Sequence, residues 1–417
     1  MITDSEETIA MTDTTSEPET PPARFWALED LRGLEFDPLL TELLRDEPVG
    51  RIRLPHGDED AWLVTRYEDV RLVTSDPRFS RSALVRRRQT ATRMTAHTVA
   101  SHAGLNYTDP PDHTRMKRIV AKVFTSQSMK RLRPVAQATA DRLLDEVEKH
   151  GPPADLMELF HGPFPLAVVS DLIGIPEHDR AQLAAWPDLV LSAGPGPQRS
   201  QAAKAELTAY ILQLLQQRRS EPREDLATVL AEAMDSGEMN QEEAVSVTTA
   251  IQVSGAHAVR NNSANMMYAL LTHPHHLARL RKEPELIPRA VDELLRYIPH
   301  RNGVGLPRVA QEDVTLGDVT IRAGEVVYAS YLSANRDPQV FPQPDTLDFD
   351  RPPTAHLAFG HGVHHCIGAS LARLELEMTV TSLLARFRDL QLAVLPEQMR
   401  WQRKGLIRGP ETLPVTW

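Results

Sequence analysis

The sequence contains one cysteine, Cys366, among its 417 residues. A single cysteine excludes an intramolecular disulfide framework and every metal site that needs two or four thiolates. The simplest interpretation of a lone cysteine is a small buried hydrophobic side chain. The residues around Cys366 must therefore decide whether it has a further role.

Long apolar segments are also missing. No stretch approaches the ~20 apolar residues that a membrane-spanning helix needs. The N-terminus is acidic where a secretory signal would be basic. Residues 1–22, rich in Thr, Glu, Ser and Pro, are expected to form a disordered lead-in. These features predict a cytoplasmic protein with a single folded domain over residues 23–417.

Positive charge is in the minority. Lys and Arg total 46 and Asp and Glu total 57, which gives a net charge of −11. This balance argues against a general nucleic-acid binder or a binder of anionic membranes. It still allows a local basic face.

Helical spacing of apolar residues dominates the chain beyond residue 76. A β-hairpin is predicted at 50–55 and 61–65 around an acidic turn, and residues 126–150 form a helical pattern that stops at Gly151. Pro134 inside that pattern marks either a kink or the true first turn. The remaining pattern predicts helices at 177–191, 201–219, 241–272, 275–281, 288–298 and 367–387, and strands at 319–321, 325–328 and near the C-terminus. Because strands at the two ends of the chain must pair, we expect one large, mainly α domain with minor β-sheet.

The segment around the cysteine, residues 359–373, reads FGHGVHHCIGASLAR. Cys366 lies just before a helical pattern, so backbone N–H groups and the helix dipole are expected to lower its pKa. Gly362 and Gly368 allow tight turns and a close approach of the backbone, and Phe359 is placed to cover the sulfur. The alternatives are an inert core cysteine or a zinc site built from this cysteine and its histidine neighbours. Zinc binding would crowd all the ligands onto one short loop.

FGHGVHHCIG resembles the haem-binding signature of bacterial cytochromes P-450, with every fixed position filled. The resemblance implies the mainly α cytochrome P-450 fold with small β-sheets. It also implies that Cys366 is the axial thiolate ligand of haem b and that His364 contacts a haem propionate. A c-type haem would need C-x-x-C-H, which this sequence lacks.

Further motifs support this resemblance. Glu293 and Arg296 lie three residues apart and would share one helix face, and the resemblance makes Arg351 the third member of a buried Glu–Arg–Arg network. His113 and Arg308 occupy positions that contact propionates in the family.

Lys117 stands where the family usually has an arginine that contacts a propionate. The charge is kept, but the bidentate fork of a guanidinium is lost. Arg115, Lys117, Arg118 and Arg373 are expected near the cysteine face. They could steer an acidic ferredoxin, or they could be a solvated charge run.

The sequence departs from the family in the helix that covers the distal haem face. The equivalent of the family's glycine and acid–alcohol pair is residues 255–259, GAHAV. Gly255 is expected to leave room for dioxygen and substrate, whereas His257 replaces the acid and Ala258 replaces the alcohol. Reduction and cleavage of dioxygen consumes two protons, and Ala258 can hold none. His257 either relays a proton or points into the protein.

Arg260, Asn261 and Asn262 follow and make this helix unusually polar. Burying so many polar groups without partners is costly. A lining that holds a polar substrate is therefore favoured over a purely structural hydrogen-bond network.

The resemblance implies a haem-thiolate oxidase of natural-product biosynthesis. It would use haem b, dioxygen and electrons from NAD(P)H through a separate ferredoxin and ferredoxin reductase, and act as a monomer. The reaction is either hydroxylation or epoxidation of a bulky polar or aromatic intermediate, or oxidative coupling or rearrangement without oxygen insertion. A haem protein that binds ligands without catalysis is the third possibility, and the complete haem loop argues against it.

Overall fold

The computed structural model describes residues 22–26, 31–87, 91–94, 104–180, 197–301, 305–402 and 407–417. Residues 1–21 of the predicted lead-in and residues 181–191 of one predicted helix lie outside the described residues. The division into a lead-in and a single domain therefore stays a prediction.

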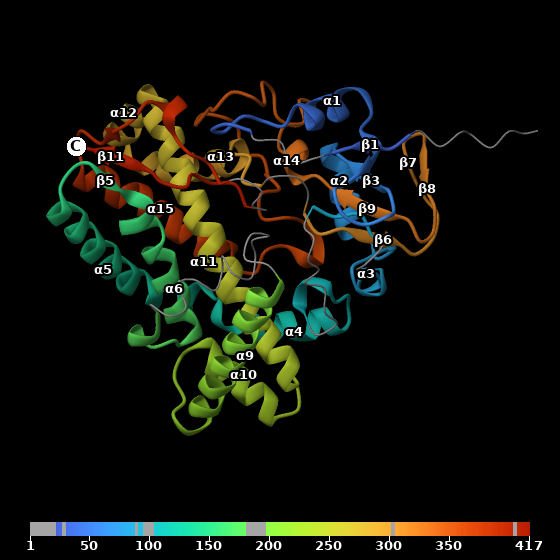
Figure 1. Cartoon of the computed structure of the whole chain (residues 1–417), viewed down its shortest axis with the longest axis horizontal. Helices are drawn as coiled ribbons and strands as arrows, with labels where there is room; N and C mark the ends of the chain where they lie inside the picture. Colours follow the sequence, from blue (N-terminus) through green and yellow to red (C-terminus); the bar gives the residue numbers. More distant parts are fainter. Residues whose placement is uncertain are drawn as a thin grey trace, which may run out of the picture.

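Helices dominate the described chain, as the sequence predicted (Figure 1). They are α1 (Pro38–Asp46), α2 (Tyr67–Ser75), α3 (Ser82–Arg86), α4 (Asp112–Val120), α5 (Ser126–His150), α6 (Pro163–Ile173), α9 (Pro197–Ser220), α10 (Leu226–Asp235), α11 (Gln241–Thr272), α12 (Pro274–Lys282), α13 (Ile287–Tyr297), α14 (Tyr331–Ala334) and α15 (Ala369–Arg386).

Strands are short. They are β1 (Arg24–Phe25), β2 (Val49–Arg53), β3 (Ala61–Val64), β4 (Phe79–Ser80), β5 (Ala154–Asp155), β6 (Arg308–Ala310), β7 (Val314–Leu316), β8 (Val319–Ile321), β9 (Val326–Ala329), β10 (Gln391–Leu392) and β11 (Pro414–Thr416).

The largest sheet has the order β1-β2-β3-β9-β6-β4, and smaller sheets pair β10-β11-β5 and β7-β8. β2 and β3 form the predicted antiparallel hairpin, and β3 then pairs in parallel with β9. Strands from both ends of the chain therefore share sheets, which confirms the predicted pairing.

Two long helices show how local sequence sets element boundaries. α5 begins after Thr125, whose hydroxyl accepts a hydrogen bond from the Ser128 backbone N–H at 3.1 Å, and ends at Gly151 with φ +76°. Because α5 runs from Ser126 through Pro134, the structure excludes the alternative in which Pro134 marks the first turn. α11 begins with a capping box between Asn240 and Glu243.

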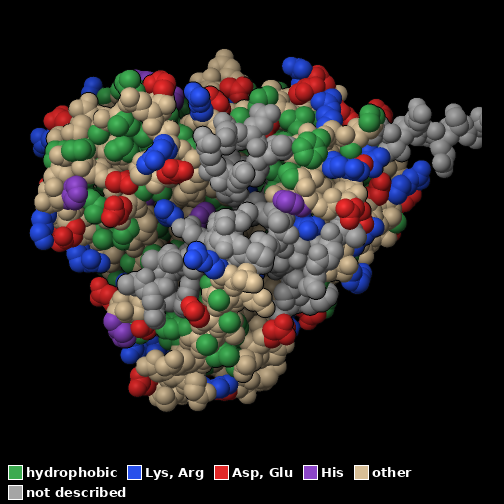
Figure 2. Space-filling view, in the orientation of Figure 1, with side chains coloured by type: hydrophobic (Ala, Val, Ile, Leu, Met, Phe, Trp, Pro, Cys, Tyr) green, Lys and Arg blue, Asp and Glu red, His purple; other side chains and the backbone are tan. Residues whose placement is uncertain are grey.

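α11 runs through the middle of the molecule (Figure 1). It packs against α6, α9 and α15, so buried residues occur on most of its sides. No helix among the described residues is long and apolar enough to cross a membrane. On the face shown in Figure 2, acidic and basic side chains are interspersed.

Candidate functional site

The loop that carries Cys366 lies directly before α15. The backbone N–H of Cys366 donates to the Phe359 carbonyl at 2.9 Å, and a short 3-10 turn, η6 (Gly362–His364), precedes it. Gly362 has φ +71°, and a Cβ there would collide with the backbone carbonyl of Thr74 at the end of α2. At Gly368 a Cβ would lie 4.0 Å from the Cys366 sulfur. Gly362 therefore allows the close backbone approach that was predicted, whereas a Cβ at Gly368 would make only ordinary van der Waals contacts.

The ionisation of Cys366 differs from the sequence-based expectation. Its side chain keeps accessible surface, yet protein atoms surround it closely, and this burial raises the pKa of the thiol. The Gly368 N–H and the cations Lys117, Arg301 and Arg373 oppose the rise without cancelling it. The prediction of a lowered pKa is therefore wrong for the thiol on its own, because desolvation outweighs the helix terminus. A thiolate here needs a strong cation at the sulfur.

A cluster of basic side chains lies beside this loop, and we call it the basic cluster: Arg81, His113, Arg308 and His364. The His113 and His364 rings lie 4.3 Å apart. Within the described part of the chain, His364 Nε2 and Arg308 Nη2 are buried and have no hydrogen-bond partner. Arg81 was not singled out in the sequence, because it belongs to no motif, and its Nε is likewise buried without a partner among the described residues.

Burial and repulsion between cations disfavour the charged forms of Arg81, His113 and His364. Burial is the main cause that lowers the pKa of His113 to about 4 and of Arg81 to about 9. Burial, followed by repulsion from Arg81, lowers the pKa of His364 strongly. The nearby carboxylate of Asp109 is engaged by Ser80, Ser82 and the Arg81 backbone. Orphaned donors and repelling cations fit an anionic ligand with two carboxylates.

Haem b meets these requirements. Its iron would be the cation at the Cys366 sulfur, and its propionates would be the anions at the basic cluster. When bound, it would supply the iron chemistry that activates dioxygen. A zinc site is not supported, because no group of three or more potential ligands that could hold a metal ion occurs among the described residues.

Lys117 has other partners than the sequence suggested. Its ammonium donates to the carbonyls of Val363 at 2.6 Å and His365 at 2.9 Å. Lys117 therefore braces the cysteine loop, and its charge also lies close enough to His113 and His364 to contribute to lowering their pKa values. The Arg373 guanidinium lies over the Phe359 ring, with Cζ 4.7 Å from the ring centroid.

The predicted Glu–Arg–Arg network is present. Arg296 donates to both carboxylate oxygens of Glu293 at 2.7 Å, and Arg351 donates to Glu293 Oε1 at 3.1 Å. The two guanidinium groups also bind backbone carbonyls over residues 335–346. The network therefore fixes the irregular segment that leads to the cysteine loop.

The distal-helix residues lie on different faces of α11. A Cβ at Gly255 would meet the Val169 side chain of α6 at 3.1 Å, so Gly255 allows close packing of two helices. That it also leaves room for dioxygen and substrate stays a prediction. His257 lines a pocket of about 490 Å³ together with Ala256, Arg260 and residues of α5 and α6. It does not share the partly accessible face of Ala258.

The polar run after residue 259 divides in the same way. Asn261 is fully buried, hydrogen-bonds the Gln402 side chain at 3.3 Å and packs against Gly409. Asn262 is half-buried and donates to the Ala258 carbonyl at 2.8 Å. Arg260, Asn261 and Asn262 therefore point to different surroundings. The prediction that this polar run lines a substrate site is wrong for Asn261, whose side chain has a structural role.

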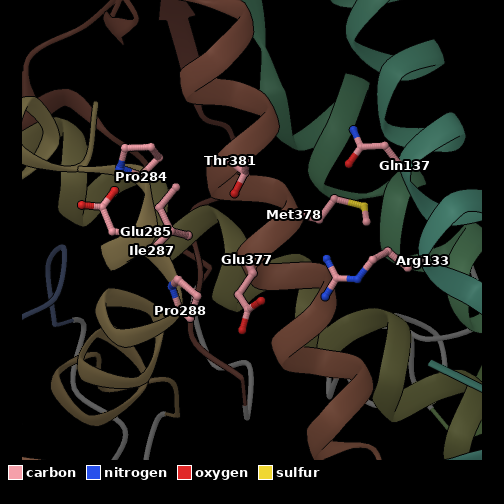
Figure 3. Close-up of a pocket in the computed structure, with 9 residues that line it drawn as sticks. All are labelled: Arg133, Gln137, Pro284, Glu285, Ile287, Pro288, Glu377, Met378 and Thr381. Carbon is pink, nitrogen blue, oxygen red and sulfur yellow. The ribbon is translucent and has the colours of Figure 1, made fainter. Parts of the chain in front are cut away.

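A separate pocket of about 210 Å³ lies between α5, α13 and α15 (Figure 3). Arg133 and Glu377 extend toward it, and burial raises the pKa of Glu377. None of its lining residues belongs to the cysteine loop or to the basic cluster.

A single thiol before a helix, a buried basic cluster and a long helix through the fold define a haem-thiolate protein. The cytochrome P-450 family model matches residues 166–415. The chain is 46% identical to the biflaviolin synthase of Streptomyces coelicolor, over 95% of this chain and 97% of that protein. It is 43% identical to nocardicin C N-oxygenase of Nocardia uniformis, over 94% of this chain and 98% of that protein.

Among solved structures, cytochrome P-450mel 107F1, described as having biaryl coupling reactivity, is 44% identical and matches with a TM-score of 0.91, over 95% of this chain and 100% of that chain. This chain therefore belongs to the cytochrome P-450 family. It is an oxidoreductase that uses haem b and dioxygen, with electrons from NAD(P)H delivered through redox partners.

Proposed function

We propose that this enzyme oxidises a bulky polar or aromatic natural-product intermediate by hydroxylation or epoxidation. In this proposal Cys366 is the axial ligand of the haem iron, and His113, Arg308 and His364, together with Arg81, hold the propionates. The observation that best supports this proposal is the buried basic cluster, in which buried donor groups have no hydrogen-bond partner among the described residues. The cluster lies beside Cys366, whose thiol would lose its proton only with a cation at the sulfur. The relatives of this chain include a mycinamicin IV hydroxylase/epoxidase of Micromonospora griseorubida, 41% identical.

Oxidative coupling without oxygen insertion is the second candidate. Ala258 provides no hydroxyl beside the site, and one similar solved structure is described as having biaryl coupling reactivity. Product mass separates the two reactions. Polar aromatic metabolites would be screened for displacement of the water from ferric haem. For each metabolite that binds, the molecular mass of the product would then be measured by mass spectrometry. A gain of one oxygen supports hydroxylation or epoxidation, whereas loss of two hydrogens supports coupling or desaturation.

The third candidate, a haem protein that binds ligands without catalysis, predicts a different result. Such a protein would show no substrate-dependent consumption of NADPH when ferredoxin and ferredoxin reductase are added. The Glu293 network and the complete cysteine loop favour an enzyme over this candidate.

A ferredoxin is the proposed electron donor, and the surface around Val363 is its proposed docking site. Val363 lies in the cysteine loop and is 42% exposed, which is unusual for a large apolar residue. Arg118 and Arg373 lie on the neighbouring elements α4 and α15, and each is ion-paired to an acid, Glu238 and Asp292 respectively. Such exposed pairs are weak, so an acidic partner could compete for the cations. The monomeric state and the cytoplasmic location stay predictions from the sequence.

A further inference from the structure

The face of α11 that carries Ala258 holds a second polar side chain, Ser254. Ser254 is exposed, although Gln252, Val253, Ala256 and His257 around it are buried. Positions four residues apart on a helix lie one above the other, with Cβ atoms about 5–6 Å apart. The Ser254 hydroxyl therefore lies one turn before Ala258 on the same face.

Neighbouring segments cover several other parts of α11. α6 covers Gly255 through Val169, the segment of His161 covers Ser263, and the C-terminal turn covers Asn265 through the Arg408 carbonyl. The face of Ser254 and Ala258 keeps accessible surface in the middle of this helix, and it is distinct from the side of His257 and Arg260, which lines the pocket against α5 and α6.

The serine and threonine hydroxyls of α11 fall into two groups, and Ser254 belongs with Ser246 and Thr249 to the group that makes no hydrogen bond to the helix backbone among the described residues. Serine and threonine in helices commonly donate to a carbonyl of the preceding turn. Thr248, Ser263 and Thr272 do so, at 2.8, 3.0 and 2.8 Å. Within the described residues, Ser254 has no such bond and its hydroxyl is left for another partner.

Asn262 completes the polar stripe on the other side of Ala258. Its amide nitrogen donates to the Ala258 carbonyl at 2.8 Å. That bond fixes the amide, whereas the Ser254 hydroxyl is free to rotate. The Asn262 amide keeps a second N–H and its carbonyl oxygen in fixed directions, whereas the Ser254 hydroxyl can rotate to donate to or accept from a hydroxyl oxygen.

We propose that Ser254 is a positioning residue that holds a hydroxyl oxygen beside Ala258, in place of the alcohol that Ala258 lacks. The oxygen belongs either to a water or to a hydroxyl of the substrate, and both use the same hydrogen bond. This inference rests on the proposed function, because it takes the Ala258 face as the substrate side of the haem.

The test compares Ser254→Ala with Ser254→Thr, which keeps the hydroxyl, and with Ser246→Ala, the same change two turns earlier in α11. The haem-thiolate spectrum of the wild type is recorded first, because its absence would overturn the proposed function itself. The spin state of the substrate-free ferric protein is then measured. Dissociation constants follow from spectral titration with 2-naphthol and with naphthalene, which lacks the hydroxyl.

If the oxygen is a water, Ser254→Ala raises the high-spin fraction of the substrate-free protein. If it is a substrate hydroxyl, Ser254→Ala weakens 2-naphthol binding about three- to tenfold, the value of one hydrogen bond, and leaves naphthalene binding unchanged. Either result, with recovery in Ser254→Thr and no effect in Ser246→Ala, supports the proposal. Ser254→Ala that matches Ser246→Ala in spin state and in both dissociation constants overturns it, while the haem-thiolate assignment stands.

Discussion

Replacing Glu293 by glutamine tests how the meander before the cysteine loop is held. Glu293 is 7% exposed, and its Oε1 accepts from Arg296, Arg351 and the Asp348 backbone N–H. Glutamine keeps the shape but removes the charge, and one of its two terminal groups becomes a donor that faces a guanidinium. Two buried cations then lose their counter-charge. Breaking a buried ion pair costs about 3–5 kcal/mol, a large part of the ~5–15 kcal/mol that stabilises a typical protein.

The assay is urea unfolding followed by helical circular dichroism, with haem retention measured at the same urea concentrations. We expect Glu293→Gln to lower the unfolding midpoint and to release haem before the helices unfold, because residues 335–351 lie between the network and the cysteine loop. Asp350→Asn is the matched control, since Asp350 makes an exposed bidentate pair with Arg279. Exposed pairs contribute little. Equal unfolding midpoints for the two variants would refute the argument that burial makes the Glu293 network contribute more to stability than an exposed ion pair.

Four further outcomes are expected. Cys366→Ser should abolish the thiolate-type CO-difference spectrum and keep the helical circular dichroism; a serine variant with that spectrum would disprove the ligand assignment. Ala258→Thr should not improve coupling of NADPH consumption to product, because the added hydroxyl takes volume on the accessible face; a fall in peroxide yield would contradict this. His257→Phe should keep full coupling, since His257 faces the pocket behind α11; uncoupling in this variant alone would make it a proton relay. Reduction by an acidic ferredoxin should slow as salt screens charges beyond ~8–10 Å, and Val363→Asp should slow it further; salt-independent rates would exclude electrostatic docking.

Most helices and strands could be predicted from the sequence because the residues that begin and end them lie next to their boundaries. α11 and α5 were predicted with their observed bounds, and each carries a capping residue at its start. The cysteine loop could likewise be located from a dense motif. Periodicity states that one face of a helix is buried, but not which segment buries it.

The features that the sequence did not predict concern partners that are distant in sequence. The role of Gly255 depends on Val169 in α6, and that of Asn261 depends on Gln402, 141 residues away. The carbonyl partners of Lys117 follow from how α4 meets the cysteine loop, which the motif did not indicate, and its contact with a propionate stays a prediction. The pKa of Cys366 required the amount of protein around it, which no local pattern supplies.

The parallel pairing of β3 with β9 has a consequence for synthesis. Val64 of β3 pairs with Ala329, which follows it by 265 residues (329 − 64). At about 5–20 residues per second, a ribosome needs roughly 15 to 50 s to add that interval. During this time the β2–β3 hairpin has an unpaired strand edge, and such edges promote association between chains. The yield of folded enzyme should therefore depend on how this edge is protected while the helical middle of the chain is being made.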